Sequence, residues 1–338
     1  MDLRVRTIWT LGLAVFVLCG ADGRSPRAQA PHPGRDQESG RQITREKVIV
    51  DTDMGDDIDD AFALALAVSS PRLQVMGVTT AWGDTEMRAR LARRFLTQTG
   101  YGGIPVAVGP RTRDSAQFTQ ERWAEAWPAP AGGFPNAIDF MRDLIERNPG
   151  QITLIAIAPY SNVAALLEQD PTEFHQLKRI VLMGGSIRRG YGDLGYLPSH
   201  GPDPEYNVAS DIPASQALFA SGVPIEMMPL DSTQLKLDEV LRATLFSRDT
   251  PVTDALGSLY AEWSYAMQNP TPTLYDAMAV AATIDPSLCP TRPMHIVVDD
   301  RGYTRVTAGP PNVSVCLRSD SDRFFHFYIP AILEGASH

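Results

Sequence analysis

Six aspartates stand within ten residues of this chain, between an apolar run and an apolar helical stretch. The run is Lys-Val-Ile-Val at 47–50, the aspartates fall within 51–60, and Ala-Phe-Ala-Leu-Ala-Leu-Ala follows at 61–67. Carboxylates this close repel one another, and the loss of water favours their protonated forms. A helix N-terminus offsets only about 0.3–1 kcal/mol for each favourable contact. The segment therefore predicts a cation bound by oxygen ligands, for which Ca²⁺ and Mg²⁺ are suited.

The rest of the chain alternates short apolar runs with helical patterns. Strands are expected at 47–50, 73–80, 152–158, 180–183 and 225–228, and helices at 61–67, 86–97, 162–169 and 277–284. This alternation favours a single α/β domain with a mainly parallel (mixed) central sheet and helices on both faces. Ligands of such sheets bind beyond the carboxyl ends of the strands, which is where 51–60 stands. A long Gly-rich loop is expected at 184–204, and such loops are often functional.

The first thirty residues have the pattern of a signal peptide. Two arginines precede an apolar stretch at 10–21, and Ala-Gln-Ala at 28–30 offers a cleavage site. We therefore expect a signal peptide at 1–30, a flexible linker at 31–45 and the catalytic domain at 46–338. The protein should be exported, either periplasmic or secreted. Lipid anchoring at Cys19 is less favoured, because Leu18 stands where a lipoprotein signal has a small residue.

Two cysteines remain once Cys19 leaves with the signal. Cys289 and Cys316 form an even pair in an oxidising compartment, so either a disulfide or two buried free thiols is consistent with the sequence. The formal charge of −10 argues against nucleic acid as a partner, and against stable membrane contact after signal removal. A small-molecule partner fits better, and a homo-oligomer is left open.

Two other families have similar acidic motifs, although only the second places them after a strand. An EF-hand loop starting at Asp51 would need an acidic twelfth residue, where Phe62 stands. A dehalogenase-type phosphatase would use Asp51 as nucleophile with Mg²⁺ and a later lysine, for which Lys178 is available. No acidic pair follows an apolar strand at a suitable place, which disfavours this alternative.

The aspartate segment resembles the N-terminal signature of the inosine-uridine-preferring nucleoside hydrolases. The resemblance rests on Asp51-x-Asp53-x-Gly55 followed by Asp59-Asp60-Ala61, although three residues rather than the common one separate the glycine from the acidic pair. Further motifs follow in family order over about residues 46–330. They are Gly-Val-Thr-Thr-Ala-Trp-Gly-Asp at 77–84, Ile-Pro-Val-Ala-Val-Gly at 104–109, Ala-Pro-Tyr-Ser-Asn at 158–162, Val-Leu-Met-Gly-Gly at 181–185, Glu-Tyr-Asn at 205–207, Pro-Leu-Asp at 229–231 and Tyr-Asp at 275–276.

The resemblance implies a nucleoside hydrolase-like fold and a Ca²⁺ site. Asp53 would ligate the metal and act as general base for the attacking water, a role that suits a carboxylate beside a cation. The other metal ligands implied are Asp60, Asp276 and the backbone carbonyl of Ser161. Asp57 would either join these ligands or take the place of Asp59, because the longer spacing makes the alignment of these aspartates with the family motif ambiguous.

The resemblance also implies a substrate site. Asp59, Glu205 and Asn207 would hold the ribose hydroxyls, together with Asp84 where the family usually has asparagine. Tyr275 stands where the family often has a histidine that protonates the departing base, and a tyrosine with a pKa near 10 is a weaker acid. Trp263 would stack on the base, although ordinary packing explains it equally well.

These expectations define the function as calcium-dependent hydrolysis of the N-glycosidic bond of ribonucleosides, giving ribose and free base. The alternative is a catalytically silent, exported protein that binds a nucleoside or sugar through the same metal. The departures at Asp84 and Tyr275 keep that alternative open.

Overall fold

Strand β1 (Glu46–Thr52) lies in the interior of the central sheet, between β2 (Leu73–Thr80) and β4 (Ile152–Ile157), and pairs with both in parallel. Its side chains alternate, so that Val48 and Val50 belong to one hydrophobic core and Ile49 to the other. Both faces of the strand are therefore buried, which explains why its sequence is a continuous apolar run.

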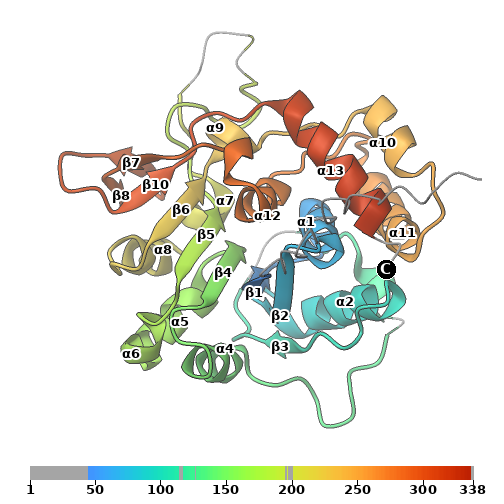
Figure 1. Ribbon diagram of the computed structural model, residues 1–338, viewed down its shortest axis with the longest axis horizontal. Helices are drawn as coiled ribbons and strands as arrows, with labels where there is room; N and C mark the ends of the chain where they lie inside the picture. The colour runs from blue at the N-terminus through green and yellow to red at the C-terminus, as the bar shows by residue number, and fades with distance from the viewer. Residues whose placement is uncertain (1–44, 114–116, 126, 195, 197–200, 336–338) are drawn as a thin grey trace, which may run out of the picture. The chain divides into compact units, whose positions relative to one another are not determined.

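The computed structural model describes residues 45–113, 117–125, 127–194, 196 and 201–335. They belong to one compact unit, Ile43–His338 (Figure 1). The expected signal peptide, and the expected linker up to residue 44, lie outside the described residues. Within the described ranges, no helix is long and apolar enough to cross a membrane.

Eight strands form the central sheet, in the order β3-β2-β1-β4-β5-β6-β10-β7. All neighbours pair in parallel except β10 and β7, which confirms the expected mainly parallel, mixed sheet. A separate antiparallel pair joins β8 to β9. The remaining strands are β3 (Val106–Val108), β5 (Arg179–Met183), β6 (Ile225–Met228), β7 (Arg292–Met294), β8 (Ile296–Val298), β9 (Thr304–Val306) and β10 (Val313–Val315).

Helices cover both faces of the sheet, as expected (Figure 1). The first core includes α1 (Asp59–Ser69), α2 (Thr85–Gln98), α11 (Pro251–Met267), α12 (Ala277–Ile284) and α13 (Ser321–Gly335). The second includes α4 (Ala137–Glu146), α5 (Ser161–Gln169), α6 (Pro171–Phe174) and α8 (Ile212–Phe219). Shorter helices are α3 (Glu121–Glu125), α7 (Tyr206–Ser210), α9 (Leu230–Thr233), α10 (Glu239–Leu245) and the 3₁₀ turn η1 (Pro286–Leu288).

Helix α1 decides where the acidic segment lies. Every residue of α1 is buried, as expected of a helix that is apolar on all sides. It packs against α12 and α13 on one face of the sheet. Because Asp59 and Asp60 form its first turn, the burial of the helix carries both carboxylates into the interior.

The predicted strands and helices agree with the structure to within a few residues. The sequence patterns did not reveal α4, α13 or the three-residue strands β7 to β10, which are too short for a periodic signal. The described part of the expected loop 184–204 contains no helix or strand after β5, as predicted.

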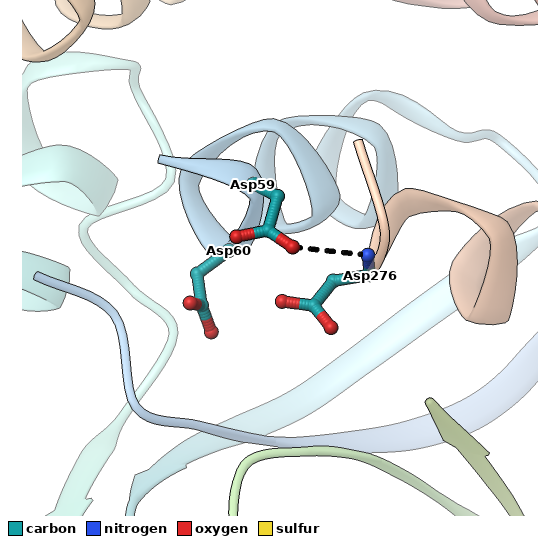
Figure 2. A group of neighbouring side chains, drawn as sticks. All are labelled: Asp59, Asp60 and Asp276. Carbon is teal, nitrogen blue, oxygen red and sulfur yellow. Dashed lines mark hydrogen bonds between the residues drawn. The ribbon is translucent and has the colours of Figure 1, made fainter. Parts of the chain in front are cut away.

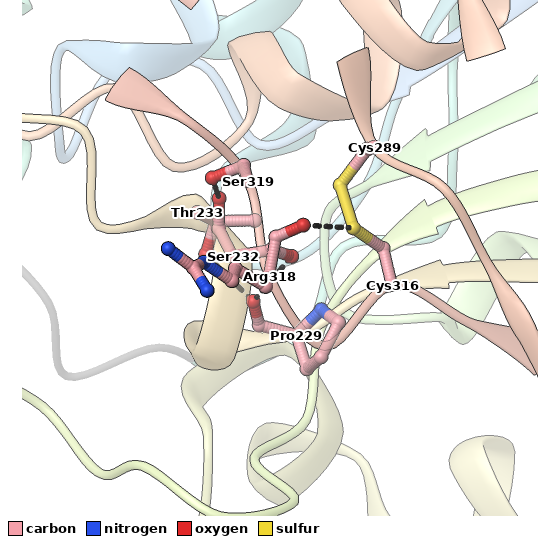
Figure 3. Close-up of a disulfide and its surroundings, with 7 residues drawn as sticks. All are labelled: Pro229, Ser232, Thr233, Cys289, Cys316, Arg318 and Ser319. Carbon is pink, nitrogen blue, oxygen red and sulfur yellow. Dashed lines mark hydrogen bonds between the residues drawn. A yellow bond between two sulfur atoms is a disulfide. The ribbon is translucent and has the colours of Figure 1, made fainter. Parts of the chain in front are cut away.

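A disulfide joins Cys289, just after η1, to Cys316, just after β10 (Figure 3). Their Cα atoms lie 5.6 Å apart and both residues are buried. Of the two arrangements left open by the sequence, the structure therefore has the disulfide. It ties the end of β10, the strand next to the sheet edge, to the turn η1 that follows α12.

We expect the double variant Cys289→Ala/Cys316→Ala to lose about 3 kcal/mol of unfolding free energy, because the bridge closes a loop of 27 residues. Urea unfolding with and without a reductant measures this. Reductant should shift the wild-type curve and leave that of the double variant in place. If the urea unfolding curve of the wild type is the same with and without reductant, the disulfide does not stabilise the protein as expected.

Candidate active site

Three buried carboxylates gather beyond the carboxyl end of β1. Asp59 and Asp60 come from the start of α1, and Asp276 immediately precedes α12, 217 residues from Asp59 (Figure 2). One carboxylate oxygen of each residue lies within 4.8 Å of the others. The backbone N–H of Asp276 donates to Asp59 Oδ2 at 3.3 Å, which fixes the two helix starts against each other.

The electrostatics of this trio fit a cation. Burial raises the pKa of each of the three carboxyls well above its ordinary value, and the charges of neighbouring aspartates add to the effect. A divalent cation would offset that cost, and a set of carboxylate oxygens suits a hard ion such as Ca²⁺ or Mg²⁺. The residues present therefore fit the metal that the sequence predicts.

Asp53 lies next to this trio, one residue beyond β1. Burial and the charge of Asp60 raise its pKa, whereas the guanidinium of Arg88 lowers it. Arg88 is itself buried and donates to the backbone oxygens of Asp53 and of Trp82, the latter at 2.8 Å. The buried guanidinium thus holds the turn that carries Asp53.

Asp51 has a structural role in this arrangement. Thr79 Oγ1 and Asn162 Nδ2 donate to its Oδ1 at 2.6 and 2.7 Å, and burial raises its pKa to about 6. Lys178 pairs with Glu46, the first residue of β1, at 3.0 Å. It therefore lies at the opposite end of the strand from Asp51, which removes the phosphatase alternative.

A cavity of about 420 Å³ opens above the carboxylates. Its wall includes most of the site residues expected from the sequence. The other residues of the wall are Asp56, Gln117, Ile157, Met183, Tyr191, Tyr206 and Met267. The expected residues that line it are Asp53, Asp57, Asp59, Asp60, Glu205, Asn207, Tyr275 and Asp276. Asp57 is exposed and is not one of the three grouped carboxylates, whereas Asp59 is, although the charge of Asp57 raises the pKa of Asp59.

Glu205 and Asn207 stand at the start of α7. Glu205 caps this helix and accepts hydrogen bonds from the backbone N–H groups of Gly185, Asn207 and Val208, at 2.9 to 3.2 Å. Burial raises the pKa of Glu205 to about 7. Asn207 Nδ2 donates to the Met183 carbonyl at 3.2 Å. Both side chains are thus held rigidly at the cavity wall.

Tyr275 forms part of the opposite aromatic wall. Its ring meets that of Tyr191 edge to face, with centroids 6.1 Å apart. Burial raises the pKa of Tyr275 to about 12, so its hydroxyl keeps its proton at neutral pH. It can donate a hydrogen bond, but it is a weak acid.

Three expected site residues do not line this cavity. Asp84 caps α2 by accepting from Met87 N–H at 3.1 Å, and it pairs with Arg111 at 2.8 Å. Trp263 is only 3% exposed and packs against Tyr260 in the core, because α11 turns this face toward α1 and α2. Ser161 is the first residue of α5, directly beyond the end of β4.

Tyr191, in the long loop, and Tyr206, at the start of α7, were missed as cavity residues for a physical reason. Tyr191 lies in the Gly-rich segment and Tyr206 just beyond it, where no periodic pattern shows which side chains turn inward. Their placement depends on tertiary contacts, since the Tyr191 hydroxyl accepts from the backbone N–H of Tyr206 at 2.9 Å. The sequence indicated only that the Gly-rich loop at 184–204 could contribute to the site, and not which of its side chains would do so.

This fold, with an acidic cavity at the carboxyl ends of parallel strands, defines an α/β enzyme whose active site is built to hold a cation. Residues 48–326 match the family model described as inosine-uridine preferring nucleoside hydrolase. The chain therefore belongs to this family of nucleoside hydrolases, and it is a hydrolase acting on N-glycosyl bonds.

Relatives and solved structures agree with this assignment. The non-specific ribonucleoside hydrolase of Shigella boydii is 32% identical, over 87% of this chain and 100% of its own length. Uridine nucleosidase 1 of Arabidopsis thaliana is 28% identical, over 72% and 75%. The purine-preferring ribonucleoside hydrolase of Gardnerella vaginalis superposes with a TM-score of 0.73 at 25% identity, over 86% and 99%, and a plant nucleoside hydrolase with 0.72 at 25%, over 85% and 99%.

Cation binding should stabilise this protein more at pH 7.5 than at pH 5.5. Raised pKa values mean that the metal-free fold binds more protons than the unfolded chain, so its stability falls as pH rises above the ordinary carboxyl range. Ca²⁺ binds the ionised groups and reverses that loss. Melting temperatures with Ca²⁺ and with a chelator, at both pH values, measure the effect.

The variant Asp276→Asn should lose most of this calcium response, whereas Glu168→Gln, at an exposed position of α5, should keep it. A wild-type protein whose melting temperature is the same with Ca²⁺ and with chelator would count against a cation site at the trio.

Proposed function

We propose that this protein is a calcium-dependent hydrolase of ribonucleosides that releases ribose and free base. The observation that carries the proposal is the trio of buried carboxylates at the floor of a cavity large enough for a nucleoside. The names of the relatives, a non-specific ribonucleoside hydrolase and a uridine nucleosidase, support the substrate class.

In this proposal Asp53, Asp60 and Asp276 hold the cation, with the backbone carbonyl of Ser161 as a further ligand. The cation supplies a lowered pKa for a water molecule and positive charge at the floor of the cavity. Asp57 is left out of this set because it is exposed, whereas Asp53, Asp60 and Asp276 are buried.

Asp53 acts as the general base. It lies beside Asp60 and lines the cavity, so its carboxylate can take a proton from a water molecule held there. Arg88 keeps its backbone in place. As the water oxygen bonds to C1′ of the ribose, one water proton passes to the Asp53 carboxylate, the C1′–N bond breaks, and its electron pair leaves with the base.

The ribose is held between Asp59, Glu205 and Asn207. All three line the cavity, and their oxygens and amide can exchange hydrogen bonds with the sugar hydroxyls. Negative charge beside the ring also stabilises the positive charge that develops on the sugar. Tyr275 lies across the cavity, where its hydroxyl can donate to the departing base. We do not assign ribose contacts to Asp84 or base stacking to Trp263, because neither lines the cavity.

We also propose that the protein is exported to the periplasm or secreted. The N-terminal pattern supports this, and so does the disulfide, since such bridges persist in oxidising compartments.

Replacing Asp53 by asparagine should lower turnover of inosine and uridine by at least about 100-fold, because the amide cannot accept the proton. Release of reducing sugar, in excess Ca²⁺, measures this. The matched control is Asp84→Asn, which changes the same group outside the cavity and should keep more than half of the activity. An Asp53→Asn variant with near-native turnover would place the base elsewhere.

Replacing Tyr275 by phenylalanine should slow inosine far more than an activated nitrophenyl riboside, whose leaving group departs without help. The reason is that only the hydroxyl is removed while the ring stays against Tyr191. The ratio of kcat/KM for the two substrates measures this. Equal losses on both would mean that Tyr275 only shapes the cavity.

A further inference from the structure

The two aspartates in the longer spacing after Gly55 have different surroundings. Asp56 forms an ion pair with Arg88, with 2.7 Å between Oδ2 and Nη2. No ion pair joins Asp57 to a described residue, and its exposed side chain lines the cavity. The spacing therefore adds to the cavity one carboxylate in an ion pair and one that forms no ion pair with a described residue.

The backbone around Asp57 is fixed by the segment 117–120. Gln120 Nε2 donates to the Asp57 carbonyl at 2.9 Å, and Thr119 Oγ1 donates to the Asp56 carbonyl at 2.6 Å. Gly55 has a φ of 134°, and a side chain there would run into the Phe118 ring. The Asp57 carboxylate is thus a charge held in place at the cavity rather than a mobile surface group.

Asp57 and Tyr275 both line the cavity. Burial raises the pKa of Tyr275 most, and the charges of Asp59 and then Asp57 add to this increase. Lys236, the cation that acts on Asp57, donates from Nζ to Thr273 Oγ1 at 2.7 Å. Seven acidic residues and no basic one are found among the described residues of the cavity wall.

These surroundings set a chemical requirement on the leaving group. A neutral base that departs with the electrons of the C1′–N bond becomes an anion unless it gains a proton, and a fixed carboxylate beside it opposes that anion. A positively charged aglycone departs as a neutral molecule and needs no proton donor. It is also attracted to the tyrosine rings of this wall.

We infer that Asp57 is a specificity-determining residue that favours N-ribosides with a positively charged aglycone, such as a pyridinium. In that reaction the water oxygen bonds to C1′, one water proton goes to Asp53, and the C1′–N electron pair cancels the charge on the departing nitrogen. The inference rests on the proposed hydrolysis and names the substrate class that this cavity selects.

The test compares two one-ring substrates, the riboside of 3-carbamoylpyridinium and uridine, in the calcium-loaded protein. The quantity measured is the ratio of their kcat/KM values, so differences in intrinsic reactivity cancel between variants. We expect Asp57→Asn to lower this ratio by about tenfold, as removing one nearby charge at a partly solvated site should. Asparagine can still accept from the Ile58 N–H, to which Asp57 Oδ1 bonds at 2.7 Å, so the fold should survive.

Asp254→Asn is the matched control, because Asp254 is an exposed residue at the opposite end of α11 from Met267, and the ratio should not change. If Asp57→Asn does not fold, Asp57→Ser removes the same charge. A ratio within twofold of wild type in the folded variant, or an equal fall in Asp254→Asn, overturns the inference while leaving the proposed hydrolysis intact. A folded, calcium-loaded wild-type protein that cleaves neither substrate overturns the proposed function itself.

Discussion

Repulsion among buried carboxylates is the constraint on which this structure depends. Asp59, Asp60 and Asp276 are nearly inaccessible to water and lie within 4.8 Å of one another through one oxygen each. Such a cluster is costly unless a cation balances it. The apolar helix α1 nevertheless buries two of the three, because its packing against α12 and α13 leaves no other position for its first turn. Fold stability and site chemistry are therefore coupled through one helix.

Around this cluster the chain supplies rigid supports. Arg88 and Asn162 each reach from a helix to the end of β1, where they hold the Asp53 turn and the Asp51 side chain. Glu205 is fixed by three backbone N–H groups. Side chains held in this way lose little freedom when a substrate binds, which is what a site acting through position and electrostatics requires.

The residues that match the family pattern and those that depart from it lie in different parts of the cavity. The floor follows the family's acidic pattern, whereas the wall carries a tyrosine at 275 and the aspartate at 57 that the longer spacing introduces. In the proposed function, the floor holds the sugar and the water, which are common to the hydrolysis of all ribonucleosides. In the same proposal, the wall contacts the leaving group, which differs between substrates, so a change in the wall changes selectivity.

The sequence by itself determined the order of the main elements, the parallel sheet and the acidic floor, because periodic burial and clustered charge are local signals. It also left Cys289 and Cys316 as the one candidate disulfide pair of the expected mature chain. Only the tertiary structure decided which side chains meet: that Asp276 joins Asp59 across 217 residues, that Trp263 turns into the core, and that Asp84 caps α2 outside the cavity. The direction of a side chain on a helix or in a loop depends on what packs against it. Local sequence patterns do not show which distant residues pack against a given side chain.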